Sequence, residues 1–347
     1  MEGSVNKGDP AIHQVAQATT PVALTRLVEH PMLKVGIAVI LLAVAAIAPF
    51  GLTGYWVRVL TSMFMYAALA SSLNIIMGYT GYTDFGNIVF FGIGAYSTGI
   101  LMREAGLPFL LAMPVGGVVC ALFAVVLGLP ILRLRGYYFA IASMGLSQAV
   151  REVVRNMEIT GGAKGFTVPM WRVPPRTFNI LIYFLMFGLT LISVAISHWV
   201  LRSRLGYGLR AIKADEEGAS VMGIDTTRHK IAAWALSAFV TGLIGGAYAL
   251  WFVYFNPDDV FNILVSVKYL VMVYLGGIGT VAGPVIGAFL LEYVSDFIWS
   301  RFSVIHLGVL GLTVIFIVLF MPRGFLHMVK TRVRPLLARV MSRSRGN

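Results

Sequence analysis

Residues 105–132 read AGLPFLLAMPVGGVVCALFAVVLGLPIL and contain no Asp, Glu, Lys or Arg. In a helix that rises about 1.5 Å per residue, about 20 apolar residues cross the roughly 30 Å hydrocarbon core of a bilayer. This stretch is therefore long enough to span a membrane. We expect eight to ten membrane passes, because similar charge-free stretches recur at 35–57, 59–83, 85–102, 136–150, 177–201, 231–257, 269–291 and 302–322.

The composition of the whole chain agrees with a membrane protein. Of its 347 residues, 58% are hydrophobic and only 12% are charged, whereas soluble domains carry about 25% charged residues. Backbone groups exposed to lipid cannot be solvated, so spanning segments are helices unless they show the alternating pattern of a membrane barrel, which is absent here. The sequence predicts an all-α, polytopic integral membrane protein.

The basic residues predict the orientation of the chain. With ten crossings and the N-terminus inside, 18 of the 27 Lys and Arg residues lie in inner segments, as in cytoplasmic loops. The anionic inner leaflet is then a sufficient partner for these charges, so the net charge of +12 does not indicate that the protein binds nucleic acid. We expect an N-terminal cytoplasmic tail (1–34), a transmembrane domain (35–322) with a cytoplasmic loop (202–230), and a basic cytoplasmic tail (323–347).

Two glycine-rich segments interrupt the apolar pattern. Residues 78–87 (GYTGYTDFGN) join glycine and hydroxyl residues to one carboxylate, and a helix does not easily persist through them. Transporters place substrates at such broken helices, although an ordinary loop with Asp84 at the water interface fits the same residues. The second segment, 275–288, is suited to close helix packing, to a sharp turn within the membrane, or to both. The small residues and the proline that favour these structures are Gly276, Gly277, Gly279, Gly283, Pro284 and Gly287.

The polar loop contains a short helix with both ends marked. Asp215 is placed to cap the first amides, Glu216 and Glu217 lie at the positive end of the dipole, and Gly223 suits a left-handed stop. A capped helix of this kind either docks into a groove of a soluble partner or lies on the inner leaflet. Its apolar side chains are Ala219, Val221, Met222 and Ile224.

The loop carries a family resemblance. Glu217-Gly218-Ala219, three residues and then Gly223 are similar to the Glu-Ala-Ala signature by which ABC importer permeases contact their ATPases. Over roughly 55–325, the chain resembles the branched-chain amino-acid permease family, and the block RGYYFAIA resembles its LivM-like half. The matching stretches are 78–96, 135–146 (RGYYFAIASMGL), 160–165, 276–288 and 320–324.

This resemblance implies an ABC importer permease in a bacterial or archaeal plasma membrane. Its partners would be a LivH-like permease, two cytoplasmic ABC ATPases that hold ATP and Mg, and a periplasmic or lipid-anchored binding protein. The chain itself would need no cofactor. The resemblance assigns ATPase coupling to Asp215, Glu216, Glu217, Gly218, Ala219, Met222 and Gly223.

The first broken segment supplies the candidates for the substrate path. Exposed amides and carbonyls there would meet the two charges of a zwitterion, and the family carries branched-chain or related hydrophobic amino acids and small amides. The sequence does not indicate which of these solutes this chain carries. The candidates are Asn74, Tyr79, Thr80, Tyr82, Thr83, Asp84 and Asn87.

Other classes of function have weaker support. The sequence has no GxxxxGK[ST] phosphate loop and no HExxH, its six histidines are scattered, and we predict neither catalytic residues nor a metal site. An ion-coupled transporter or a channel would need charges within the membrane. Asp84, Glu292, Asp296 and Lys268, which directly precedes the run 269–291, leave that alternative open.

Overall fold

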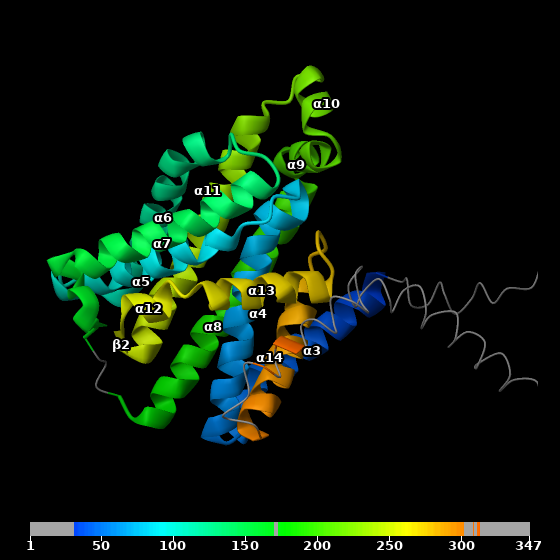
Figure 1. Ribbon diagram of the computed structural model, residues 1–347. Helices are drawn as coiled ribbons and strands as arrows, with labels where there is room; N and C mark the ends of the chain where they lie inside the picture. Colours follow the sequence, from blue (N-terminus) through cyan, green and yellow to red (C-terminus); the bar gives the residue numbers. More distant parts are fainter. Residues whose placement is uncertain (1–30, 170–172, 302–307, 309–310, 313–347) are drawn as a thin grey trace, which may run out of the picture. The chain divides into compact units, whose positions relative to one another are not determined.

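The computed structural model describes residues 31–169, 173–301, 308 and 311–312. This part of the chain is almost entirely helical, and its only strands form one short two-stranded sheet (Figure 1). The predicted all-α, polytopic fold is confirmed. The chain divides into two units: α3 (Pro31–Gly51) is the described part of one, and the other spans Leu52–Thr331.

Six helical segments of the described part are long and apolar enough to cross a membrane. α3, α7 (Tyr137–Asn156) and α14 (Gly283–Arg301) are helices outside this set, and 302–322 lies almost wholly outside the described residues, so the total of eight to ten passes stays a prediction. The six are α4 (Gly54–Thr80), η1 with α5 (Phe85–Asn87 and Ile88–Arg103), α6 (Phe109–Ile131), α8 (Pro175–Arg202), α11 (Thr226–Phe252), and α12 with α13 (Pro257–Val260 and Ile263–Gly276).

The predicted break in the apolar run 269–291 is confirmed. α13 ends at Gly276 and α14 begins at Gly283, so a turn divides the run. α13 also begins at Ile263, which places Lys268 inside the helix rather than ahead of it. The ammonium of Lys268 lies 2.6 Å from a carboxylate oxygen of Glu292 on α14. Because this pairing lowers the cost of burying the charge, the helix extends through a residue that the charge-free run had excluded.

α4 is the central helix of the Leu52–Thr331 unit. It packs against α8, α11, α13 and α14, and nearly all of its residues from 63 to 80 are buried. α11 packs in turn on α5 and α6. α6 leaves large apolar side chains exposed, among them Leu110, Leu122 and Val126. In a polytopic protein, such side chains face lipid or another subunit.

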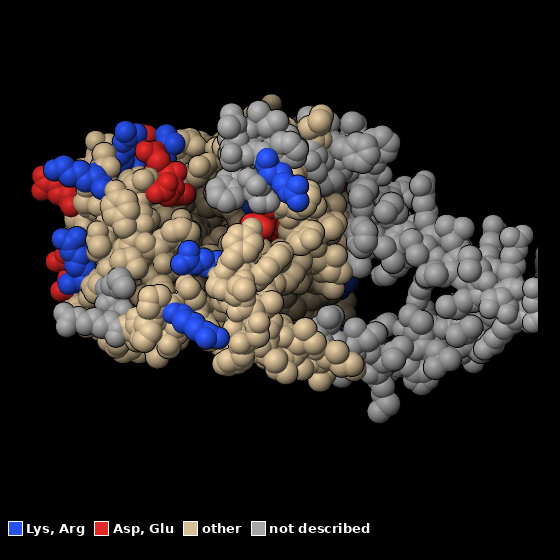
Figure 2. Space-filling model, turned by 90° about the horizontal axis from the view of Figure 1, so that it is seen from below, with Lys and Arg blue, Asp and Glu red and all other residues tan. Residues whose placement is uncertain are grey.

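Connections of this unit gather at two ends (Figure 1). One end, here called the α10 end, holds α9 (Arg204–Ala214), α10 (Glu216–Val221) and the turns 81–84, 132–136 and 277–282. The other, here called the sheet end, pairs β1 (Phe166–Thr167) with β2 (Tyr254–Phe255) in an antiparallel sheet, next to η2 (Glu158–Thr160) and η3 (Gly162–Lys164). Figure 2 shows the face away from α10, where charged side chains gather mainly along the left edge and most of the described surface is uncharged.

Candidate functional site

α10 is a six-residue helix with marked ends. Asp215 is its N-cap, and one carboxylate oxygen accepts a hydrogen bond from the backbone N–H of Glu217 at 3.1 Å. A Cβ at Gly218 would lie 2.6 Å from the other carboxylate oxygen, so glycine here leaves room for the cap. The chain leaves the helix through Gly223, whose φ of +88° is in the region that favours glycine.

The surface of α10 divides into an inner and an outer side. Ala219 is buried, whereas Val221 and Met222 are 88% and 85% exposed. Two nearly bare apolar side chains at the tip of a charged loop cost free energy in water. They therefore form a small apolar knob that suits a groove on another protein.

A charged network connects α10 to the rest of the unit. Glu216 lies 2.7 Å from the ammonium of Lys230, the fifth residue of α11, and accepts a hydrogen bond from the Tyr82 hydroxyl at 2.5 Å. Lys230 is buried, and it also donates to the backbone carbonyl of Leu132 at 2.8 Å. One carboxylate thereby joins α10 to α11 and to the turn after α4, and its ammonium partner extends the link to the end of α6.

The surroundings of Glu216 favour its ionised form. Burial alone would raise the pKa of Glu216, but hydrogen bonds from Lys230 and Tyr82 and the charges of Lys230 and Arg135 hold it below its ordinary value. The neighbouring Glu217 pairs with Arg135 at 2.7 Å. Both acidic residues of α10 therefore contact basic residues from other elements at neutral pH.

α9 forms a second connection to α4. The Lys213 ammonium donates to the backbone carbonyl of Gly78 at 2.8 Å, close to the C-terminus of α4 at Thr80. A cation there satisfies a terminal carbonyl and interacts favourably with the helix dipole. Burial lowers the pKa of Lys213. Neither Lys213 nor Lys230 stood out in the sequence, because a basic residue in a predicted cytoplasmic loop is unremarkable.

Asp84 is fully buried, which contradicts one of the two alternatives for this segment, an ordinary loop with Asp84 at the water interface. One carboxylate oxygen accepts from the indole N–H of Trp234 at 2.7 Å, and the other from the backbone N–H of Gly86 at 3.0 Å. The amide nitrogen of Asn87 is 3.5 Å away. Within the described residues, no basic side chain pairs with Asp84. Neutral donors thus hold this carboxylate in place.

Asn87 extends this arrangement into a buried polar cluster, here called the Asp84 cluster. Its amide donates to the Ser237 hydroxyl at 3.2 Å and accepts from that of Thr241 at 3.1 Å. Trp234, Ser237 and Thr241 recur at i, i+3 and i+7 on α11 and therefore share one helix face. That spacing was a readable signal that the sequence analysis missed. The other members are Ser72 of α4 and Tyr269 of α13.

The remaining substrate-path candidates are also buried, except Thr83. Tyr79 is hydrogen-bonded to the Ser197 hydroxyl at 2.8 Å, Thr80 donates to a carbonyl of its own helix, and Thr83 is partly exposed. Asn74 donates to the Thr280 carbonyl at 3.0 Å and accepts from the N–H of Gly279 at 2.9 Å. Their contact with substrate stays a prediction. No group of three His, Cys, Asp or Glu side chains in the described ranges could hold a metal ion.

The second glycine segment forms a tight hairpin between α13 and α14. A Cβ at Gly276 would lie 1.7 Å from the Gly283 carbonyl oxygen, and one at Gly287 would lie 1.9 Å from that of Met272. The turn itself uses Gly277 and Gly279 at φ values of +121° and +78°. Pro284 follows at the second position of α14, where its missing N–H costs nothing. Glycine is required here for close approach and for the turn.

Three further charged residues lie along the seam between α4, α13 and α14. Besides the Lys268–Glu292 pair, Asp296 accepts a hydrogen bond from the Tyr55 hydroxyl at 2.8 Å. Glu292 and Asp296 are four residues apart, on the same face of α14. These side chains are therefore organised with partners from other helices, rather than scattered over the surface.

Residues 55–320 match the family described as the branched-chain amino acid transport system / permease component. The chain is 30% identical to the high-affinity branched-chain amino acid transport system permease protein LivM of Salmonella typhimurium, over 85% of this chain and 75% of that protein. The LivM protein of Escherichia coli K12 is 29% identical, over 85% and 76%. The Escherichia coli K12 permease protein LivH is 23% identical, over 75% and 91%. No solved structure matches significantly.

The family match covers the whole described part of the Leu52–Thr331 unit except its first residues. It includes both glycine segments, the polar loop and all six membrane-spanning segments. The relatives are transport subunits rather than enzymes. The chain therefore belongs to the branched-chain amino acid transport permease family and is a multi-pass membrane transport subunit of the LivM type.

Proposed function

We propose that this chain is one permease half of an ABC importer that carries branched-chain or closely related hydrophobic amino acids. It would work with a LivH-like permease, two cytoplasmic ATPases and a substrate-binding protein. Membership of the family supports this proposal, as do its LivM and LivH relatives, which are permease proteins of high-affinity branched-chain amino acid transport systems. The absence of a phosphate loop from the sequence agrees with ATP hydrolysis in other subunits.

The observation that carries the proposal is the connection of α10 to the membrane helices. The exposed Val221 and Met222 offer an apolar contact to an ATPase, while Glu216 contacts Lys230 and Tyr82 from the same short helix. A displacement of α10 would therefore move its contact residues at the start of α11 and in the turn after α4. This is the mechanical link that an importer needs between ATP hydrolysis and helix movement.

We also propose a sidedness for the chain. We place the α10 end in the cytoplasm of a bacterial or archaeal cell, with both termini on that side and the sheet end facing outward. The segments 133–136 and 202–230 contain eight Lys and Arg residues, which agrees with the usual excess of basic residues in cytoplasmic loops. The binding protein would then approach the sheet end.

Two substitutions test the docking role of α10. Gly223→Val forces a β-branched residue into a left-handed conformation, and Glu217→Arg places a cation at the positive end of α10 beside Arg135. We expect either variant to remain in the membrane and to abolish ATP-driven leucine uptake. Uptake into proteoliposomes that contain the complete transporter measures this, together with co-purification of the ATPases.

Matched variants at the sheet end control for general damage. Gly106→Val alters another left-handed glycine with open space around it, and Glu104→Arg reverses another exposed acidic residue. Both should retain uptake. If Gly223→Val or Glu217→Arg transported normally with its ATPases bound, α10 would not be the docking element.

A further inference from the structure

The Lys268–Glu292 pair lies at the middle of two packed helices. Lys268 is the sixth of the 14 residues of α13, and Glu292 is the tenth of the 19 residues of α14. The Lys268 and Glu292 side chains are 18% and 12% exposed, so they are mostly buried but still accessible from outside the protein. Charged residues at membrane depth are costly and tend to mark transport pathways. The pair therefore requires an explanation beyond helix packing.

Glu292 differs from the other buried carboxylates in its partners. Asp84 accepts from the Trp234 indole and from a backbone N–H, and Glu216 contacts Lys230 and Tyr82. Among the described residues, only Lys268 pairs with the Glu292 carboxylate. A carboxylate has about four acceptor sites. Most of the accepting capacity of Glu292 is thus unused within the described part of the chain.

Lys268 has spare capacity in the same way. An ammonium has three donors, and the ion pair with the Glu292 oxygen, 2.6 Å away, occupies at most one of them. The second contact of Lys268 is the ring of Tyr66 on α4, whose centroid lies 4.4 Å from the nitrogen. A ring face stabilises a cation without occupying its N–H donors in strong hydrogen bonds. The Tyr66 ring thus stabilises the Lys268 ammonium, while the remaining N–H donors of Lys268 can still bind polar groups.

We propose that Lys268 and Glu292 form a recognition site for the zwitterionic head of the transported amino acid, which deepens the function proposed above and rests on it. The Lys268 ammonium would bind the α-carboxylate, and the Glu292 carboxylate would bind the α-ammonium. The substrate carries the same two charges as the pair, and each meets its opposite. The pair holds its own charges together between substrates, and the substrate inserts into it or binds across it.

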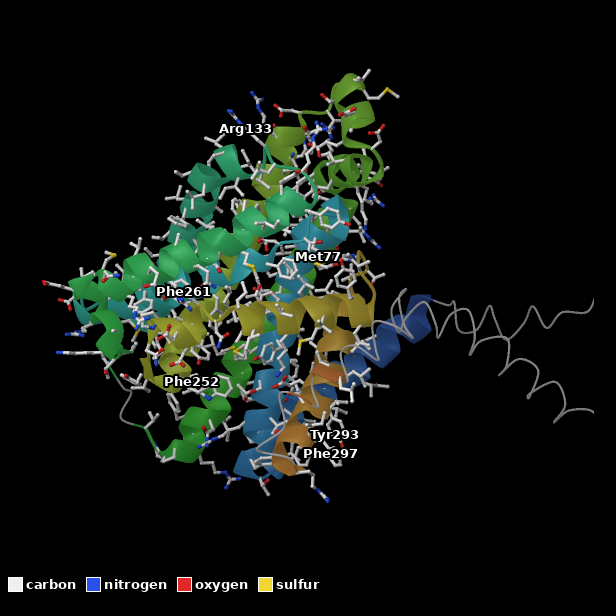
Figure 3. All side chains as sticks on the ribbon, viewed as in Figure 1. Met77, Arg133, Phe252, Phe261, Tyr293 and Phe297 are labelled. Atoms are coloured by element: carbon white, nitrogen blue, oxygen red, sulfur yellow. The ribbon has the colours of Figure 1, made fainter. Side chains whose placement is uncertain are left out.

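The surroundings on α14 provide the rest of such a site. Tyr293 and Phe297 lie near each other on this helix and are 53% and 54% exposed (Figure 3). They directly follow Glu292 and Asp296 in sequence, so they form an apolar strip on the adjoining face of α14, about 100° around the helix from the carboxylates. Asp296, with Tyr55, lies one turn further along the helix, toward its C-terminal end. A hydrophobic amino acid needs this combination of charge recognition and neighbouring apolar surface.

The decisive experiment compares single and double neutral variants in the complete transporter, reconstituted with the ATPases, the partner permease and the leucine-loaded binding protein. Lys268→Met or Glu292→Gln alone leaves one sheltered charge unpaired, which damages a structural pair and a recognition site alike. The double variant removes both charges and the structural penalty with them. We therefore expect it to assemble and to show stimulated ATPase activity, while leucine uptake falls roughly tenfold, as when a hydrogen bond to a charged group is lost.

Each outcome has one meaning. Recovery of leucine uptake in the double variant to near the parent rate would overturn the recognition site and leave a structural pair. If the double variant failed to assemble, the exchanged pair, Lys268→Glu with Glu292→Lys, would replace it, because it keeps the ion pair but reverses the charges that substrate meets. Normal uptake by that variant would also overturn the proposal. If the unmodified transporter carried no branched-chain amino acid, the proposed function itself would fail.

Discussion

The two glycine-broken segments of this permease are built on different physical principles. The turn after α4 is held by polar side chains: Asp84 binds Trp234 and Gly86, and Tyr82 binds Glu216 of α10. The α13–α14 hairpin is held by backbone contact, since a Cβ at Gly276 or Gly287 would lie within 2 Å of a carbonyl oxygen. The first segment can therefore transmit a movement of α10, whereas the second mainly fixes how two helices pack. Asn74 connects them, through its hydrogen bonds to Gly279 and Thr280.

The largest effect should come from filling the backbone contact of the hairpin. In Gly287→Ala, the new Cβ would meet the Met272 carbonyl oxygen at 1.9 Å, which forces α13 and α14 apart. We expect a loss of about 1–3 kcal/mol of stability or more, as for overpacked cores, and a large fall in monodisperse protein extracted in detergent. The melting temperature of the purified chain measures the effect. Gly188→Ala in α8, which meets no atom within 4 Å, is the control; equal behaviour of the two would show that the hairpin is not sterically locked.

Removal of the buried carboxylate should have an effect of similar size. Asp84→Ala leaves the Trp234 indole and the Gly86 N–H without their acceptor, and each such loss costs about 1–3 kcal/mol. We expect a clear fall in melting temperature, and a smaller one for Asp84→Asn, which keeps an acceptor. The control is Asp258→Ala, since that side chain is largely exposed. An unchanged melting temperature in Asp84→Ala would mean that polar contacts do not hold this turn.

The turn after α4 should be more sensitive in transport than in assembly. Gly81 ends α4 with a φ of +81°, and a leucine there would be strained by about 1–2 kcal/mol. We expect Gly81→Leu to assemble with its ATPases but to lower leucine uptake severalfold. Gly106→Leu, at a left-handed position of the sheet end, should transport normally. Unchanged flux in Gly81→Leu would reduce the segment to an ordinary loop.

The smallest effect should come from a single hydroxyl of the network. Tyr82→Phe removes the hydroxyl that donates to Glu216 and accepts from Lys230, and it leaves the Lys230–Glu216 ion pair in place. We expect only a small loss of stability and a modest rise in the ATP hydrolysed per leucine transported. Tyr254→Phe, which removes a hydrogen bond to the Lys164 carbonyl at the sheet end, should leave this ratio unchanged. Equal ratios in the two variants would show that Tyr82 does not take part in coupling.

Local patterns predicted several features correctly. The uninterrupted apolar residues of 105–132 were sufficient to predict a helix, and the structure has α6 over Phe109–Ile131. The ends of α10 needed only a capping carboxylate and a glycine, and Asp215 and Gly223 take those roles. Such features depend on residues within one or two turns of each other, so neighbouring sequence was sufficient to read them.

Local patterns could not predict the contacts between distant segments of the chain. The sequence alone determined that the chain spans a membrane as helices, where glycine breaks them, and that a capped helix lies in a basic loop. Only the tertiary structure decided that Asp84 is buried, because its donor Trp234 is 150 residues away, and that Lys268 lies inside α13, because Glu292 comes from another helix. The cost of burying a charge depends on the partners that folding brings to it, and a one-dimensional count of charges does not contain those partners.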